Sequence, residues 1–168
     1  MSKRINRSSL RIALILALAV TLIAGLGITL RQTTRAQSRA EAAVRDTLMK
    51  STLSFERNDL AMATKVWAND ESLTVFEQGH ANYGWADYRD HHLVPEMAEF
   101  KNTKYSLDNI KVHLVGKTAW ATFTYTISGD VDARHVDSVG LGTAVLEERQ
   151  GNWQIVHWHS SAPRRAPA

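Results

Sequence analysis

The sequence predicts an α+β fold: a curved antiparallel sheet forming a cone-shaped half-barrel covered by three helices, preceded by an N-terminal hydrophobic helix. Three observations support this prediction. An uncharged apolar run lies near the start, helical spacing follows it, and the last third alternates between β-rich segments and short turns. With 168 residues, the chain can bury one hydrophobic core once the leader is set aside.

The first 36 residues are predicted to be a membrane-directing leader. Residues 12–30 carry no charge, and as a helix they would span about 28 Å, close to the thickness of a bilayer's hydrocarbon core. Basic residues precede this run, as in an export signal. Thr34-Arg35-Ala36 resembles a signal-peptide cleavage site, whereas the length of the run and the arginines after it favour a retained transmembrane anchor. Either alternative places the domain, residues 37–168, outside the cytoplasm, in the periplasm.

The formal net charge of +3 is misleading, because the basic excess belongs to the leader. Residues 37–168 contain 14 basic and 17 acidic residues and so carry a net charge of −3. We therefore expect no nucleic-acid partner. The chain has no cysteine, which excludes disulfides and thiolate metal sites.

Three helices are predicted in the first half of the domain. Apolar and small residues recur at steps of three and four in the first of them: Ala40, Val44, Leu48, Ser51 and Phe55. Asp59 is a suitable N-cap for a short second helix that ends near Trp67. Residues 72–77 are predicted to form a strand. The third helix covers residues 85–100, and Pro95 should kink or divide it.

The last third predicts a β-meander. Residues 105–115, 118–128, 136–148 and 153–160 are rich in β-branched and aromatic side chains, and short turn sequences separate them. Connections this short require antiparallel neighbours. A long antiparallel sheet twists and curls, and helices that cover its concave face leave one end open. That open end is where we expect a pocket.

Two strings carry a family resemblance. The last predicted strand, from Trp153 to Pro163 (WQIVHWHSSAP), closely resembles the final strand of the calcium/calmodulin-dependent protein kinase II association domain and is similar to bacterial SnoaL-like domains of the nuclear transport factor 2-like superfamily. Gly84 to Met97 resembles the third-helix region of the same bacterial group. The resemblance covers roughly residues 40–163 and implies the cone-shaped α+β barrel. It leaves the function open, because this fold carries enzymes, oligomerisation modules and transport factors.

His157 and His159 are the first candidates for chemistry. They share one face of a strand with Trp153 and Ile155, because these four residues occupy every second position. A face that carries Trp and Ile is a buried one, so we expect both imidazoles to face the core or pocket. Either histidine could bind a ligand or act as a general base, or the two could be core histidines with satisfied hydrogen bonds.

A second group of polar candidates lies on the third helix. His92 and Glu96 are four residues apart and share a helical face next to His91. Together with His157 and His159 they have the ligand types for a divalent metal. The alternative for the helix pair is an N-cap, ion-pair or surface role. The sequence does not show that helix and strand converge, so we assign no metal and no other cofactor.

Aromatic residues complete the predicted pocket. The candidates are Tyr83, Trp85, Tyr88, Trp120 and Tyr125, which could equally be plain core. Asp90 and Glu77 are the acids nearest to them. Steroid isomerases of this fold use a buried carboxylate as base, but no motif here identifies such a set.

Three functions therefore stay open. The first is a noncatalytic module that binds a small apolar or aromatic ligand and pairs with itself as a homodimer, as the resemblance implies. The second is an isomerase, cyclase or dehydratase, of ketosteroid-isomerase or polyketide-cyclase type, with a histidine or carboxylate as general base. The third is an assembly scaffold. The chain has no kinase motif.

Overall fold

A computed structural model describes residues 7–163, with side chains described from Gln32 onward. Contacts divide the chain into two compact units, Met1–Arg39 and Ala40–Ala168. The predicted membrane segment, residues 12–30, lies outside the residues whose side chains are described. Among the described residues, none of the helices combines the length and the apolar character needed to cross a bilayer.

Two of the three predicted helices begin where the sequence places them, and the first is the last part of a longer helix. Helix α1 spans Arg7–Glu56, and its part within the second unit buries Val44, Leu48 and Phe55 in the core. Helix α2, Leu60–Val66, has Asp59 as N-cap, whose carboxylate accepts a hydrogen bond from the Met62 amide at 2.8 Å. The predicted N-cap is therefore confirmed, and it stabilises the first turn of α2.

The predicted third helix is divided into three pieces. Helix α3 spans Trp85–Tyr88, a π-helical turn covers Arg89–Leu93, and helix α4 spans Val94–Glu99. Pro95 lies in the first turn of α4, where its missing N–H costs little. The wider π-helical turn just before it carries His91 and His92, and single π turns of this kind are frequent at functional sites.

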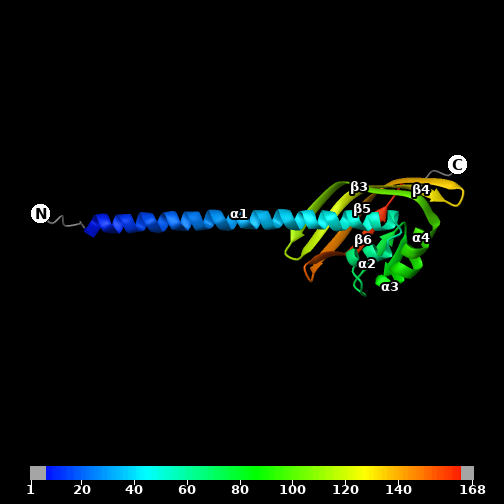
Figure 1. Cartoon of the computed structure of the whole chain (residues 1–168), viewed down its shortest axis with the longest axis horizontal. Coiled ribbons are helices and arrows are strands. Elements are labelled where there is room, and N and C mark those ends of the chain that lie inside the picture. The colour runs from blue at the N-terminus through cyan, green and yellow to red at the C-terminus, as the bar shows by residue number, and fades with distance from the viewer. Residues whose placement is uncertain (1–6, 164–168) are drawn as a thin grey trace. The chain divides into compact units, whose positions relative to one another are not determined.

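Six strands form one sheet in the order β2-β1-β6-β5-β4-β3. Their bounds are Thr74–Glu77 (β1), His80–Tyr83 (β2), Phe100–Val115 (β3), Thr118–Val131 (β4), Arg134–Arg149 (β5) and Asn152–Ser161 (β6). In Figure 1 the long strands β3 to β6 run side by side, and α2, α3 and α4 lie together on one side of them. The α+β prediction with a curved sheet and three helices is confirmed.

The sheet is mixed rather than wholly antiparallel. Strand β1 pairs with β6 in parallel, and every other neighbouring pair is antiparallel. The prediction was wrong on this point because the last four strands alone show short turns, whereas the chain between β1 and β6 is long enough for a crossover. Strand β2 was also not predicted. It joins β1 through Gln78 and Gly79, both with positive φ, as in a tight hairpin turn.

The core lies between the helices and the inner face of the sheet. The inner face of β4 contributes Ala119, Ala121, Phe123 and Tyr125 at alternating positions. The small residues lie near the start of β4, and the aromatic residues follow further along it. This gradient in side-chain size along one strand fits a cone that is filled at one end.

Candidate functional site

A cavity of about 280 Å³ lies between the C-terminal part of α1, the π-helical turn and the inner face of the sheet. Its walls combine aromatic and apolar side chains with polar ones in about equal numbers. The lining residues are Phe55, Trp67, Leu93, Phe100, Tyr105, Tyr125, Ile127, Val136 and Trp158, together with Ser51, Thr52, Glu77, Gln78, His80, Tyr88, His92, Glu96, Ser138 and Ser160. Apolar walls into which polar groups project are typical of small-molecule sites.

Glu77 makes three polar contacts at the wall of this cavity. It is the last residue of β1 and pairs with Ser160 of the parallel strand β6. Its Oε1 accepts hydrogen bonds from the Trp158 indole N–H at 2.9 Å and from the Ser160 hydroxyl at 3.0 Å. Its Oε2 lies 3.0 Å from Nε2 of His92. These donors and the imidazole hold the carboxylate in one orientation at the cavity wall.

His92 lies between two carboxylates. Besides the contact with Glu77, its Nε2 lies 3.4 Å from Oε1 of Glu96, one turn further along the helix. Hydrogen bonds to Glu77 and Glu96 raise the pKa of His92 from 6.5 to about 10, although burial opposes the shift. The side chain of His92 is only 13% exposed, so His92 is a partly buried imidazolium that faces the cavity.

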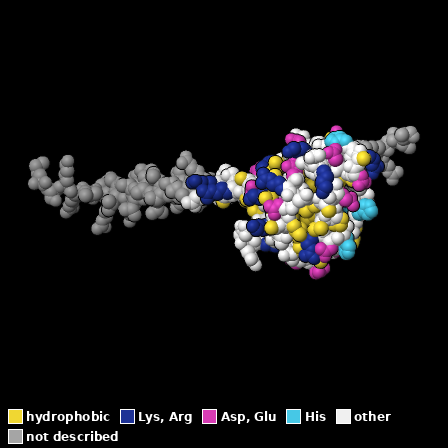
Figure 2. Space-filling model, turned by 45° about the vertical axis from the view of Figure 1, so that its right-hand side comes forward, with side chains coloured by type: hydrophobic (Ala, Val, Ile, Leu, Met, Phe, Trp, Pro, Cys, Tyr) yellow, Lys and Arg dark blue, Asp and Glu magenta, His cyan; other side chains and the backbone are white. Residues whose placement is uncertain are grey.

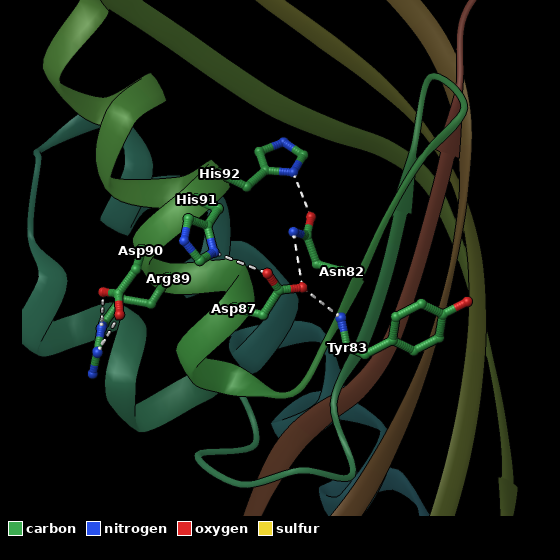
Figure 3. A network of polar contacts seen from close by, with 7 residues as sticks. All are labelled: Asn82, Tyr83, Asp87, Arg89, Asp90, His91 and His92. Atoms are coloured by element: carbon green, nitrogen blue, oxygen red, sulfur yellow. Dashed lines mark hydrogen bonds and ion pairs between the residues drawn. The ribbon is translucent and has the colours of Figure 1, made fainter.

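Asn82 fixes the other side of the His92 ring. Its Oδ1 accepts a hydrogen bond from Nδ1 of His92 at 2.8 Å, and its Nδ2 donates to Oδ2 of Asp87 at 3.2 Å. Asp87 also accepts from the Tyr83 amide, and its second oxygen lies 2.9 Å from Nδ1 of His91. Figure 3 shows this chain of contacts from the hairpin strand β2 to the helix. Because the amide nitrogen of Asn82 donates to Asp87, the amide oxygen is the atom that faces His92. This oxygen can only accept a hydrogen bond, so His92 must carry a proton on Nδ1.

Three tyrosines line the cavity near these groups. Burial, and then the negative charge of Glu77, raise the pKa of Tyr88 and of Tyr105 well above 10. Burial also raises the pKa of Tyr125, while hydrogen bonds with Ser138 and Ser160 oppose the shift. All three phenols therefore stay protonated at neutral pH and can act as hydrogen-bond donors toward a ligand.

Trp67 carries a buried N–H group without a partner. Its side chain lines the cavity and is 4% exposed, and Nε1 is the only side-chain polar atom of this kind among the described residues. A buried donor without an acceptor is costly and rare. The nitrogen is sealed from solvent and from the cavity, so it is an unpaired polar group of the core.

The structure places the predicted site residues in three groups. Tyr88, His92 and Tyr125, with the acids Glu77 and Glu96, line the cavity. Tyr83 and His91 are exposed, Trp85 is buried in the core beside Tyr88, and the exposed Asp90 pairs with Arg89 at 2.6 Å. Trp120, His157 and His159 lie on the other face of the sheet, where Trp120 stacks on His113.

The prediction that His157 and His159 face inward is wrong. The register of β5 and β6 pairs Leu146 with Ile155 but Val145 with His157, so Val156 is an extra residue on β6. Such a bulge reverses the alternation of the side chains that follow it. Trp158 and Ser160 therefore point inward, and Nδ1 of His157 instead lies 2.7 Å from the Thr74 hydroxyl. The metal candidates of helix and strand do not converge for the same reason.

Sequence reasoning missed Trp67, Asn82, Tyr105, Trp158 and Ser160. Trp158 and Ser160 alternate with the two histidines on β6, so the alternation of the two faces is visible in the sequence. The prediction assigned the inner face to the histidines instead of to Trp158 and Ser160. Asn82 lies in β2, for which no strand is predicted, and no local pattern shows that it reaches the third helix.

The stability of the protein should depend on pH through His92. Because its pKa rises from 6.5 in the unfolded chain to about 10 in the folded one, its contribution is fully present below pH 6.5 and is lost as the pH rises through 10. The free energy of unfolding should fall across this window by up to about 1.4 kcal/mol per pH unit. Urea denaturation at several pH values measures this slope. The slope should be smaller in His92→Gln and unchanged in His135→Gln, whose imidazole pairs with Asp130 at the surface.

Trp67 and Trp158 allow a matched test of the hydrogen bond to Glu77. Both indoles are almost fully buried, but only that of Trp158 has an acceptor. Because hydrogen bonds to charged groups are the strong ones, Trp158→Phe should lower the free energy of unfolding by about 2 kcal/mol more than Trp67→Phe. Chemical denaturation of the two variants tests this difference, and equal losses would contradict the assignment.

Comparison with known proteins agrees with this fold. The model of the SnoaL-like domain family matches residues 44–165. A nuclear transport factor 2-like superfamily protein from Salmonella enterica serovar Typhimurium superposes with a TM-score of 0.72 at 17% identity, covering 78% of this chain and 96% of that chain. No curated protein matches this sequence.

Two enzyme-like structures also superpose. A protein from Shewanella frigidimarina, provisionally assigned as a ketosteroid isomerase, has a TM-score of 0.61 at 21% identity and covers 69% of this chain and 92% of that chain. The hexachlorocyclohexane dehydrochlorinase LinA-type3 from Novosphingobium barchaimii has a TM-score of 0.66 at 13% identity, covering 79% and 92%. At these identities the likeness concerns the fold alone. The family match, which spans most of the second unit, shows that this chain belongs to the SnoaL-like domain family.

Proposed function

We propose that the domain binds a small, largely apolar or aromatic molecule in its cavity. The observation that carries this proposal is a cavity of about 280 Å³ whose aromatic walls surround the Glu77–His92 pair. The walls supply apolar contact, and the tyrosine hydroxyls supply donors that orient a ligand. Such a ligand would carry at least one hydrogen-bond acceptor.

Two neighbouring positions on β5 test this proposal. Ser138 lines the cavity, whereas Val139 points away from it and is exposed. Ser138→Phe should therefore fill part of the cavity and abolish thermal stabilisation by small aromatic ketones and phenols. Val139→Phe should leave that stabilisation unchanged. Equal responses of the two variants, or no stabilisation of the wild type by any compound of this class, would refute the proposal.

A second candidate is an enzyme that moves protons. It is favoured by the direct contact of a carboxylate with an imidazolium at the cavity wall, and by the enzyme-like neighbours among the solved structures. In this scheme Glu77 removes a proton from a carbon next to a carbonyl group, and His92 donates a proton to the carbonyl oxygen. Both protons then return as the enol rearranges.

Proton exchange is the sharpest test of this candidate. A ketone whose α-protons exchange with deuterated solvent faster in the presence of the protein would support it, with NMR as the measurement. Glu77→Gln should remove the acceleration, and His135→Gln should retain it. Binding of the same ketone without any accelerated exchange would favour the noncatalytic module.

We also propose that the chain reaches the membrane through residues 12–30 and holds its domain outside the cytoplasm. The support is the uncharged run with basic residues before it. Mass spectrometry of the mature N-terminus separates a retained anchor from a signal peptide cleaved after Ala36. Recovery of the intact chain in the cytosol would contradict both.

Self-association is the remaining proposal. The outer face of the sheet exposes Trp120, Val139 and Leu141. Figure 2 shows one face of the domain on which hydrophobic side chains gather between charged ones. Exposed apolar patches are common at interfaces between proteins. A homodimer through this face should dissociate when Leu141 is replaced by Lys, as measured by sedimentation. A monomeric wild type would exclude the homodimer and the assembly scaffold.

A further inference from the structure

We propose that Glu77, His92 and Glu96 bind a divalent transition-metal ion at the cavity wall. The three side chains offer ligand atoms that all lie within 4.8 Å of one another. They come from three elements: Glu77 ends β1, His92 lies on the π-helical turn and Glu96 lies on α4. The inference deepens the proposed ligand site, because it names the group that a ligand's polar end would meet.

The distances fit coordination to one ion. Two ligand atoms about 2.1 Å from a metal are about 3.0 Å apart at a right angle and about 3.4 Å apart at a tetrahedral angle. Nε2 of His92 lies 3.0 Å from Oε2 of Glu77 and 3.4 Å from Oε1 of Glu96. An ion bound to these three atoms would displace the proton on Nε2 of His92 and would require little movement of the side chains.

The surrounding residues hold each inner ligand in place. Asn82 accepts the hydrogen bond of Nδ1 of His92, which leaves Nε2 for the metal, and Asp87 orients the Asn82 amide. Trp158 and Ser160 both donate to Oε1 of Glu77 and leave Oε2 directed at His92. Such partners of the ligands are a regular feature of protein metal sites. A cluster of surface charges would lack them, and here Glu77 and His92 are only 19% and 13% exposed.

The type of metal follows from the ligands. One imidazole and two carboxylates suit Zn²⁺, Mn²⁺, Fe²⁺ or Co²⁺, whereas Mg²⁺ and Ca²⁺ prefer sites made of oxygen alone. Three protein ligands leave at least one coordination position for water or for a ligand in the cavity.

Metal titration of the full chain tests the inference. The protein is stripped with a chelator and titrated with Zn²⁺ and with Mn²⁺ by calorimetry, without any organic ligand. We expect one ion per chain. His92→Gln and Glu96→Gln should each weaken binding at least tenfold, and Asn82→Ala should weaken it about tenfold through the orientation of His92. His135→Gln, which removes another histidine paired with a carboxylate, should bind as the wild type does.

Each outcome decides between a metal site and an ion pair. Glu96 is half-exposed, so Glu96→Gln should fold even if a change at Glu77 does not. Binding of neither ion, or equal binding by the wild type, His92→Gln and Glu96→Gln, overturns the inference. Ser138→Phe separates it from the proposed ligand site: that variant should still bind the metal while it loses the small molecule. Metal binding without any ligand binding would refute the proposed function alone.

Discussion

Glu77→Leu is expected to lower the free energy of unfolding by about 3 kcal/mol, because it removes one member of a partly buried ion pair. The change leaves the Trp158 indole N–H and the Ser160 hydroxyl without their acceptor and leaves the His92 imidazolium with Glu96 as its remaining carboxylate partner. The leucine itself suits the apolar wall of the cavity. The decrease in the free energy of unfolding therefore measures the cost of leaving these polar groups unpaired. Urea denaturation at pH 7 gives the difference.

Two further variants show whether the charge or the hydrogen bonds matter. Glu77→Gln keeps an oxygen that can accept hydrogen bonds from Trp158 and Ser160 but removes the charge opposite His92. Its free energy of unfolding should therefore lie between those of the wild type and Glu77→Leu. Glu99→Leu is the matched control, because Glu99 is an exposed residue at the end of α4. Its effect should be close to zero. A wild-type stability of Glu77→Leu would show that the contacts around Glu77 contribute little to folding.

The fold could be predicted because its signals are local. The recurrence of Val44, Leu48 and Phe55 at helical spacing predicts α1 without any knowledge of its partner, and β-rich segments joined by short turns predict the four long strands. The parallel pairing of β1 with β6 and the strand β2 could not be predicted. Residues 80–83 (HANY) are polar and few, so they form a strand because β1 lies next to them rather than by their own preference.

The site was predicted less well because it depends on register and on long-range contact. The alternation on β6 was recognised, but one extra residue at Val156 exchanges the two faces, and no local pattern marks that bulge. The helical pair of His92 with Glu96 was recognised from its spacing. Glu77 was identified only as a nearby acid, because its contact with His92 joins residues from different elements.

Two glycines of β5 show how closely the inner face of the sheet is packed. Gly140 and Gly142 alternate with outward residues on the face that also carries Ala144 and Leu146. The rings of Tyr125 and Phe123 on the neighbouring strand occupy the space above them. A methyl group at Gly142 would lie closer than 3.0 Å to three atoms of the Phe123 ring. The glycine is therefore required by packing rather than by its backbone angles.

Gly142→Ala is accordingly expected to lower the free energy of unfolding by about 3 kcal/mol, at the upper end for an overpacked core. Phe123 cannot move away freely, because its ring also packs against Trp158, with the ring centres 4.8 Å apart. Chemical denaturation of Gly142→Ala, of Phe123→Leu and of the double variant forms a double-mutant cycle. If the clash with the ring is the cause, Phe123→Leu should cost less in the Gly142→Ala background than in the wild type, because the smaller side chain makes room for the methyl group. If the decreases in the free energy of unfolding of the two single variants add up in the double variant, the destabilisation by Gly142→Ala would instead arise in the strand backbone.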